Sequence, residues 1–460
     1  MKKIFFLFLL IIGAIVIYTE TTRLKFDKKP QNVILISIDG LQAKHLAEYG
    51  YALKTTPNLD GFLDSSYLFM NTISPSSWTV PTHMSIFTSM FPSEHKVVNK
   101  FLDYDPASKS GTVANLKQLT PSAVTLAEIF KNNGYVTGGF TGDSGVGKQF
   151  GFSQGFDEYY DAQAFGGFDG SVPKALDWLA KNKDKKFFLF LHGYDVHGQY
   201  APASGFDYRY VTQPYTGQFT GSPAEQATLR EEGLKNGKLN LSLQDVSFWR
   251  AIYDEKINRM DFEFNSFMEQ IKKMGVMDNT AIVVFSDHGT EFYEHQRLDH
   301  GHTLYGELVD VLFAIHLPGQ NTGKKIMSLV STIDIMPTIL KLVGINNPVP
   351  AQVKGIDLTP SLNGADLSRD IFMETDYRLY THKRAVQTPD GWKFILTLEN
   401  SGRELYNLKN DPGEQINLED KEPKKAYELE QELDKHLKDM NALDGPWVVG
   451  CSPVYPGQCL

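Results

Sequence analysis

The stretch Asn32-Val33-Ile34-Leu35-Ile36-Ser37-Ile38-Asp39-Gly40 decides the fold class of this chain. It is a nearly continuous run of β-branched and aliphatic residues, which is typical of a parallel strand buried on both faces. The run ends at Asp39. Open α/β sheets bind their ligands at the C-terminal edge of such strands, so Asp39 is a candidate site residue, although an aspartate here can also serve only to form a turn.

Two later stretches repeat this pattern of an apolar strand followed by ionisable side chains. Residues 186–200 run from an aromatic strand into His192, Asp195 and His197, and residues 279–289 end in Asp287-His288-Gly289. Helical patterns separate the three strands, and we place them at residues 125–132, 173–183 and 246–274. This alternation predicts a mostly parallel, doubly wound sheet with its chemistry at one edge.

A helix start lies between the first two of these strands, in Ser77-Trp78-Thr79-Val80-Pro81-Thr82-His83. Pro81 suits a first helical turn, which puts Thr79 at or near the N-cap. The unpaired backbone N–H groups of a helix N-terminus favour a phosphate or sulfate group. A threonine that only caps the helix would have the same sequence signature, so both interpretations stay open at this point.

The amino-acid composition of the chain limits the kinds of partner that it can bind. The chain has 460 residues, with 45 Lys and Arg against 55 Asp and Glu, and a formal net charge of −10. The basic residues are scattered, so no basic face is available for a nucleic-acid backbone, and we expect no nucleic-acid partner. The length predicts about two or three domains.

The N-terminus predicts export. Met1-Lys2-Lys3 precedes an uncharged, apolar run over residues 4–18, and residues 1–25 therefore have the pattern of a signal peptide or signal-anchor. A helix over that run reaches only about 22 Å, yet no small-residue cleavage site follows, which favours an uncleaved membrane anchor and a periplasmic or extracellular location. Cys451 and Cys459 can close a small loop in an oxidising compartment, or remain unpaired.

Six motifs together resemble the sulfatase branch of the alkaline-phosphatase superfamily. They occupy residues 33–64, 77–83, 286–289, 301–305, 332–338 and 404–412. The resemblance implies a three-layer αβα sandwich with a mostly parallel sheet over residues 32–345. It also implies a small C-terminal α+β domain, with an antiparallel sheet and a helix, over residues 350–460. Residues 201–245 are rich in Gly, Gln, Ser and Thr, and we interpret them as an insertion at the rim of the site.

The chain departs from the sulfatase pattern that it resembles at the position of the nucleophile. Sulfatases resemble one another in a Cys-or-Ser, x, Pro, x, Arg motif whose first residue is oxidised to formylglycine, and this chain has Thr79 and His83 at the first and last positions. Oxidation of a threonine would give a poorly hydrated ketone. The superfamily members that use Thr or Ser directly act on phosphoesters, so the resemblance implies that Thr79 is itself the nucleophile. Gly40 stands where many sulfatases have a second metal-binding aspartate.

The resemblance also implies a set of site residues. Asp39, Thr79, Asp287 and His288 would hold one divalent metal ion, which could be Ca, Mg, Mn or Zn, because oxygen and imidazole donors suit all four. Asp195 is a candidate ligand for a possible second metal. His197 and His300 are candidate catalytic residues, and His83 and His302 are candidate substrate-binding residues.

These residues predict a metal-dependent ester hydrolase or transferase, with phosphate mono- and diesters as the expected substrates. Sulfuric ester hydrolysis on the same scaffold is the alternative. A catalytically inactive surface protein that binds anionic glycans or lipids is another, although such a protein needs no nucleophile. The oligomeric state stays open. In the C-terminal segment we expect Lys383 and Arg384 to be solvated charges on a hairpin strand.

Overall fold

The computed structural model describes residues 29–98, 118–142, 144–163, 165–198, 208–346, 350–378 and 381–440. The predicted N-terminal segment over residues 1–25, with its apolar run at 4–18, lies outside these residues, as do Cys451 and Cys459. Within the described part of the chain, no helix is both long enough and apolar enough to cross a membrane.

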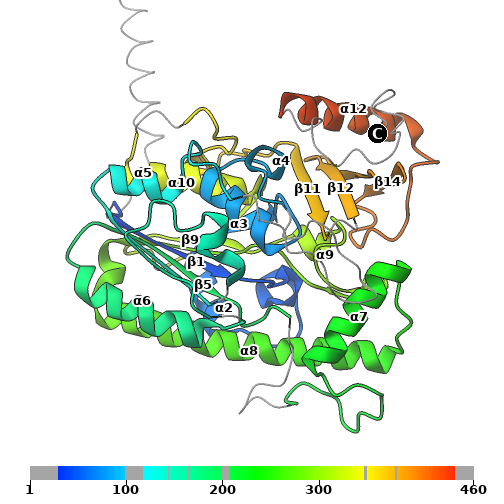
Figure 1. Ribbon diagram of the computed structural model, residues 1–460, viewed down its shortest axis with the longest axis horizontal. Coiled ribbons are helices and arrows are strands. Elements are labelled where there is room, and N and C mark those ends of the chain that lie inside the picture. The colour runs from blue at the N-terminus through cyan, green and yellow to red at the C-terminus, as the bar shows by residue number, and fades with distance from the viewer. Residues whose placement is uncertain are drawn as a thin grey trace, which may run out of the picture.

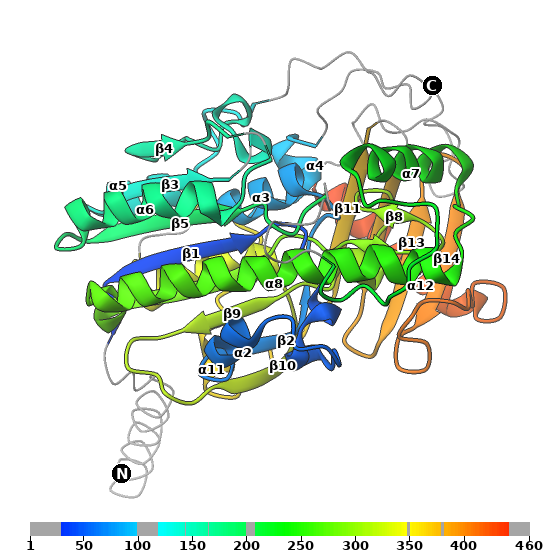
Figure 2. The same cartoon turned by 90° about the horizontal axis from the view of Figure 1, so that it is seen from below.

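An eight-stranded sheet forms the centre of the larger part of the molecule (Figures 1 and 2). Its strand order is β10-β2-β9-β6-β1-β5-β3-β4. Every pairing in it is parallel except the two made by β9, which runs antiparallel to both β2 and β6. The strands are β1 (Asn32–Ile38), β2 (Tyr67–Ile73), β3 (Val136–Thr141), β4 (Glu158–Tyr160), β5 (Phe187–Gly193), β6 (Thr280–Ser286), β9 (Phe313–His316) and β10 (Lys324–Ser331).

Helices cover both faces of this sheet, which gives the predicted three layers. Alternate residues of β1 show this directly: Ile34, Ile36 and Ile38 pack into one core, whereas Val33 and Leu35 pack into the other. The first core holds the helices α2 (Pro57–Leu63), α6 (Phe168–Asn182) and α8 (Leu243–Lys273). The second core holds α3 (Thr79–Thr88), α5 (Leu126–Asn132) and α10 (Ile335–Val343). Figure 1 shows the two helical layers above and below the strands.

The C-terminal part is a four-stranded antiparallel meander with one helix packed on it, as expected. Its strands are β11 (Ile371–Tyr377), β12 (Thr381–Gln387), β13 (Trp392–Thr397) and β14 (Gly402–Asn407), and its helix is α12 (Pro423–Asp439). Apolar residues of α12, including Leu429 and Leu433, pack on Phe394 of β13. The mostly parallel α/β sheet and the antiparallel C-terminal sheet confirm the predicted fold class.

The helix boundaries differ slightly from those predicted. Thr125 caps α5 through a capping box with Glu128, as the sequence indicated. Helix α6 begins at Phe168, before the predicted start at residue 173, and Pro173 lies inside it. Within residues 201–245 the structure has a helix, α7 (Pro223–Asn236), whose N-cap Ser222 forms a capping box with Glu225.

The remaining elements are short. They are α4 (Pro92–His95), α9 (Gly306–Val309), α11 (Thr359–Leu362), β7 (Glu291–Phe292), β8 (Leu298–Asp299) and the 3-10 turns Ala43–His45, Ala47–Tyr49, Ser144–Val146, Lys148–Phe150, Val276–Asn279 and Thr332–Asp334. Strands β7 and β8 pair with each other beyond the end of β6 and carry residues of the candidate site.

The expectation that Arg384 is solvated is wrong. Its side chain on β12 is buried, and its two terminal nitrogens donate to the two carboxylate oxygens of Asp376 on β11 at 3.1 and 3.2 Å. Lys383 is largely buried as well and lies 3.7 Å from Glu404 of β14. A charged side chain tolerates burial when a carboxylate with good geometry compensates for its lost hydration.

Candidate active site

Three neighbouring strands deliver the ionisable residues to one edge of the sheet. The central strand β1 lies between β5 and β6, and its parallel register pairs Ile38 with Gly193 on one side and with Ser286 on the other. Asp39 and Asp287 each directly follow one of these paired residues. The register therefore brings the two aspartates together from positions far apart in the chain.

Four side chains converge around one point at this edge. Oγ1 of Thr79 lies 3.3 Å from Oδ1 of Asp39 and 3.2 Å from Nε2 of His288. Nε2 of His288 also lies 3.4 Å from Oδ1 of Asp39 and 3.4 Å from Oδ2 of Asp287. Ligand atoms that share one cation at about 2.0–2.6 Å lie about 3 to 3.6 Å apart, so these spacings fit a single divalent ion.

The hydrogen bonds of these residues also fit a cation. His288 donates from Nδ1 to the carbonyl oxygen of Gly289 at 2.8 Å, so Nε2 faces the cluster. Although burial opposes it, the carboxylates of Asp287 and Asp39 raise the pKa of His288 to about 9, so a cation bound there would replace the proton on Nε2. Oδ2 of Asp287 is buried and has no hydrogen-bond partner among the described residues, whereas Oδ1 accepts from the backbone N–H of Gly40 at 3.0 Å. A buried carboxylate oxygen without a donor is costly unless a positive charge lies nearby.

The pKa shifts of the two aspartates also favour a bound cation. Burial, together with the carboxylate of Asp39, raises the pKa of Asp287 to about 7. Burial opposes ionisation of Asp39 too, but the imidazoles of His197, His192 and His288 hold its pKa well below the usual range. Two carboxylates this close repel each other, and one divalent cation between them would stabilise both.

Thr79 is the first residue of α3, and Trp78, which has an extended backbone, is the N-cap. The hydroxyl of Thr79 therefore lies beside the backbone N–H groups of the first helical turn, which have no partners within the helix. Asp39, Asp287 and His288 are 0% exposed, whereas Thr79, His197 and His300 are 6–8% exposed. All six residues are buried, and the three predicted to be catalytic are slightly more exposed than the three metal-ligand candidates.

His197 and His300 lie beside the cluster. The ring of His300 is 4.5 Å from that of His288 and 4.4 Å from that of His197. The nitrogens of these three histidines form a second group that could hold a cation, beside the group of Asp39, His83 and Asp287. The two groups meet at His288, whose Nε2 lies 3.4 Å from both aspartates. Burial lowers the pKa of His300 to about 4, so its neutral form is favoured.

The structure explains why residue 40 is a glycine. Its φ of +73° lies in the left-handed region, and a Cβ added there would meet the backbone of His197 at 3.2 Å. A side chain at this position would be both strained and crowded, so His197 occupies the space that a second aspartate would need.

Two of the predicted site residues have their ring nitrogens engaged by protein atoms. His83 donates from Nδ1 to the carbonyl oxygen of Thr79 at 2.9 Å and bonds Ser37 through Nε2 at 2.8 Å. His302 bonds Glu291 through Nε2 at 2.7 Å, and its Nδ1 lies 3.3 Å from the carbonyl oxygen of His300. Both residues therefore hold their neighbours in place, and their proposed contact with a substrate stays a prediction.

Asp195 does not face the cluster either. Its Oδ2 accepts from the backbone N–H of Phe168 at 2.9 Å, at the N-terminus of α6, and burial raises its pKa to about 6. Asp195 thus caps a helix, and the structure gives no support for it as a ligand of a second metal.

Sequence reasoning missed two residues that orient this site. Nε2 of His192 lies 2.9 Å from Oδ2 of Asp39, which fixes the carboxylate so that Oδ1 faces Thr79. Asp299 bonds Nδ1 of His300 through Oδ1, and its Oδ2 lies 3.4 Å from the guanidinium of Arg230 on α7. His192 lies near the end of an apolar strand, as Asp39 does, and this sequence pattern could have identified it. No sequence pattern indicates that Asp299 pairs with Arg230.

Comparisons with known proteins assign the family. A model of the sulfatase family, described as "Sulfatase", matches residues 31–345, and a model described as "N-sulphoglucosamine sulphohydrolase, C-terminal" matches residues 293–442. The first match covers more than half of the chain, and the chain therefore belongs to the sulfatase family and is a hydrolase of that family.

Individual relatives are distant but cover most of the chain. A delta 4,5-hexuronate-2-O-sulfatase from Bacteroides thetaiotaomicron is 24% identical over 439 residues, which cover 86% of each chain. A solved structure in complex with its substrate D-glucosamine-2-N,6-O-disulfate has a TM-score of 0.69 at 19% identity and covers 91% of this chain and 99% of the other. The phosphonate monoester hydrolase of Agrobacterium radiobacter has a TM-score of 0.69 at 18% identity, covering 90% and 96%. These structural similarities show that the fold is shared.

Proposed function

We propose that this protein hydrolyses anionic esters of glycans, with Oγ1 of Thr79 as the nucleophile and a divalent cation held by Asp39, Asp287 and His288. The observation that carries the proposal is the position of Oγ1, within 3.3 Å of Asp39 and His288 and at the solvent-accessible side of the cluster. A cation bound there would lower the cost of forming the threonine alkoxide and would offset charge on the ester oxygens.

Each residue of the site then has its own role in the proposed reaction. The hydroxyl of Thr79 attacks the central atom of the ester, and the backbone N–H groups at the start of α3 face the oxygens of the transferred group. His300 donates from Nδ1 to Asp299, so Nε2 of the neutral ring carries no proton. Nε2 can accept the proton that the hydroxyl of Thr79 releases during the attack and pass it to the departing ester oxygen. Water must next hydrolyse the ester formed on Thr79 to restore the hydroxyl.

Sulfuric esters are the first candidate substrate. The named relatives favour them over the phosphate esters that the sequence alone led us to expect, since the curated relative is a hexuronate 2-O-sulfatase. A complex with a disulfated glucosamine is solved on the same fold. Sulfated sugars are accordingly the class to test first.

Phosphate esters are the second candidate, and Thr79 is the observation that favours them. A threonine cannot supply the aldehyde hydrate that sulfatases are expected to use, and a direct hydroxyl nucleophile is the chemistry of phosphoryl transfer in the wider superfamily. A phosphonate monoester hydrolase has the same fold, which is a reason to keep phosphorus esters among the substrates to test.

Matched 4-nitrophenyl sulfate, phosphate and phosphodiester substrates would test both candidates, with wild type and Thr79→Ala saturated with each divalent metal. Faster turnover of the sulfate supports the first candidate, and faster turnover of a phosphate ester supports the second. Equal rates for wild type and Thr79→Ala on every substrate would refute the proposed nucleophile.

Export also belongs to this proposal. The apolar run over residues 4–18 after Lys2 and Lys3 supports secretion to the periplasm or the cell exterior, with the run either cleaved or kept as an anchor. Fractionation of the native producer, followed by N-terminal sequencing of the recovered protein, would decide between these outcomes. Full-length protein in the cytosol would refute export.

A further inference from the structure

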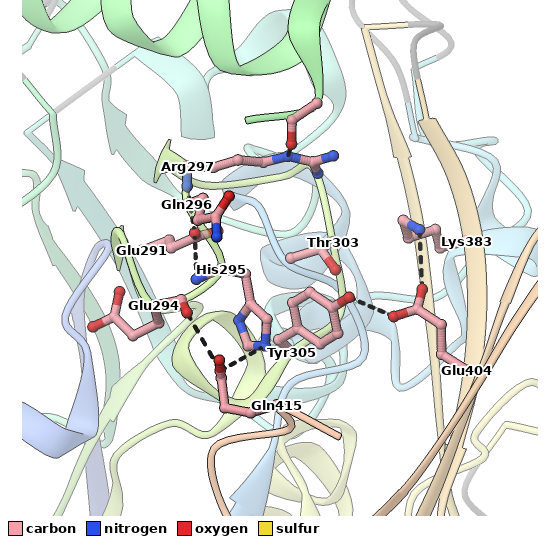
Figure 3. A pocket seen from close by; sticks show the side chains of 11 residues that line it. Glu291, Glu294, His295, Gln296, Arg297, Thr303, Tyr305, Lys383, Glu404 and Gln415 are labelled. Atoms are coloured by element: carbon pink, nitrogen blue, oxygen red, sulfur yellow. Dashed lines mark hydrogen bonds and ion pairs between the residues drawn. The ribbon is translucent and has the colours of Figure 1, made fainter. Parts of the chain in front are cut away.

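A cavity of about 410 Å³ lies between the segment 291–305 and the small C-terminal sheet (Figure 3). Its walls come from the segment 291–305, from β12 and β14 of the small sheet through Lys383 and Glu404, and from Gln415. None of the proposed metal-binding or catalytic residues lines it. Its volume falls within the range of about 300–1,000 Å³ that is usual for small-molecule sites.

The carboxylates around this cavity are already engaged by donors of the protein. Glu404 accepts from the hydroxyls of Tyr305 and Tyr406. Glu291 accepts from two backbone N–H groups, at 2.8 and 2.9 Å, and from His302. Glu294 is engaged by Arg250 at 3.3 Å. These acids therefore have little capacity left for a cationic ligand.

The side-chain groups of the cavity walls that remain available to a ligand are hydrogen-bond donors. Arg297 donates from Nε to the carbonyl oxygen of Gly237 at 2.7 Å, and its terminal nitrogens have no partner among the described residues. Lys383 lies close enough for Arg297 to help lower its pKa, a shift whose largest cause is burial. Lys383 is already engaged by Glu404, at 3.7 Å, and by the hydroxyl of Thr397, so the guanidinium of Arg297 is the cationic group that can pair with an anionic ligand.

A buried hydroxyl adds a second, independent observation. Thr303 lines the cavity and is 1% exposed, yet its Oγ1 has no hydrogen-bond partner among the described residues. Figure 3 shows Thr303 between Arg297 and Lys383 in this view. A buried hydroxyl without a partner costs about 1–3 kcal/mol, which a ligand oxygen or a water molecule in the cavity would offset.

We propose that this cavity binds a sugar acid, a hydroxyl-rich ligand whose single carboxylate or sulfate pairs with Arg297 and whose oxygens bond Thr303. Two sources share this chemistry. The ligand is either the neighbouring unit of the glycan whose ester is cleaved, which rests on the proposed function, or a free sugar acid.

The cavity and the active site share a wall. Glu291, which lines the cavity, bonds His302, and His302 contacts the carbonyl oxygen of His300. Thr303 directly follows His302 in the chain. A ligand that orders Thr303 and Arg297 therefore also restrains the loop that carries His300.

Isothermal titration of the full-length Thr79→Ala variant with D-glucuronate tests the site without any need for turnover, so its outcome is independent of the proposed hydrolysis. D-glucose is the control for the charge. We expect millimolar or tighter binding of glucuronate, at least tenfold weaker binding of glucose, and at least tenfold weaker glucuronate binding when Arg297→Gln or Thr303→Val is added. Arg259→Gln, on α8 and paired with Asp169, is the matched control and should bind as before.

Absence of glucuronate binding, equal binding of glucose, or binding unchanged by both Arg297→Gln and Thr303→Val would overturn the proposal. A second arm separates the two sources. If the ligand is part of the substrate, Arg297→Gln raises KM for an ester of a uronate-containing disaccharide but not for the nitrophenyl ester. If it is a free sugar acid, added glucuronate changes the nitrophenyl rate in wild type and not in Arg297→Gln.

Discussion

The carboxylate of Asp299 bonds Nδ1 of His300 and so orients a histidine that faces the candidate metal cluster. Asp299 is fully buried and adopts a φ of +89°, which is strained for a residue with a side chain. Its second oxygen lies near Arg230 and Gln226 of α7. A helix from the predicted rim insertion thereby helps to fix the position of His300.

This pairing predicts that Asp299→Asn lowers kcat about 10–100-fold, the usual cost of losing a group that orients an active-site histidine. The loss should grow as the leaving group becomes a poorer one, since a misoriented His300 moves a proton less effectively. Rates for a series of aryl esters of rising leaving-group pKa measure this. Asp157→Asn, whose aspartate pairs with Lys131, is the control. An unchanged leaving-group dependence would assign Asp299 a structural role only.

Thr79→Ala should abolish turnover, with a loss of at least about 10³ in kcat, while the protein stays folded and metal-bound. Trp78, and not Thr79, is the N-cap of α3, and no side-chain hydrogen bond caps this helix, so loss of the Thr79 hydroxyl should cost less than the roughly 1 kcal/mol of stability that a lost cap costs. Thr79→Ser should keep part of the activity. Thr88→Ala, at the other end of α3, removes a hydroxyl that bonds Met84 and should leave the rate intact.

The same nucleophile should carry the transferred group during turnover. Acid-quenched wild type, digested and mapped by mass spectrometry, should show sulfate or phosphate on Thr79. Finding the group on another residue, or near wild-type activity in Thr79→Ala, would remove Thr79 from the proposed mechanism.

The sequence allowed the fold and the centre of the site to be predicted because their signals are local. Asp39 and Asp287 each directly follow an apolar strand. Because parallel strands in register end at one edge of the sheet, each aspartate could be assigned to the site from its own strand alone. The family motifs then pointed to Thr79 and His288. Asp299, by contrast, depends on α7, whose Arg230 is distant in sequence and carries no pattern of its own.

Interactions across the small sheet were equally hard to predict. Arg384 looks solvated because a charged residue on a hairpin strand usually is, yet antiparallel pairing brings β11 alongside and Asp376 compensates for its burial. His83 and His302 had suitable residue types, but the sequence could not show that Ser37 and Glu291 already occupy their ring nitrogens.

The metal set predicts that Asp287→Asn lowers the bound divalent metal from about one ion per chain to a small fraction of it, measured by plasma mass spectrometry after gel filtration. The change removes one of the two carboxylates that share the charge of the cation. Asp195→Asn is the matched control because Asp195 caps α6, and its metal content should equal that of wild type. An equal loss of metal in both variants would mean that Asp195 is also a ligand.

His436 predicts an acid-sensitive C-terminal helix. Its ring stacks on Phe372 at 3.8 Å and lies 4.6 Å from the ring of Phe91, and its Nε2 has no partner among the described residues. Burial, assisted by Lys354, lowers the pKa of His436 to about 3. Below the unfolded-state pKa of about 6.5, the unfolded chain binds a proton that the folded helix excludes. This contribution to stability is therefore complete above pH 6.5 and falls as the pH falls from 6.5 toward 3.

The expected loss at pH 5 is about 1–2 kcal/mol relative to pH 7.5. Urea unfolding followed at both pH values would measure it. His436→Phe keeps the aromatic stack and removes the titrating group, so its stability should fall less between the two pH values than that of wild type. Any other buried histidines that the fold keeps neutral, such as His95 with its pKa lowered by burial to about 3, act equally in both proteins and cancel in the comparison. The same pH dependence in His436→Phe and in wild type would show that His436 is not the residue that makes the helix acid-sensitive.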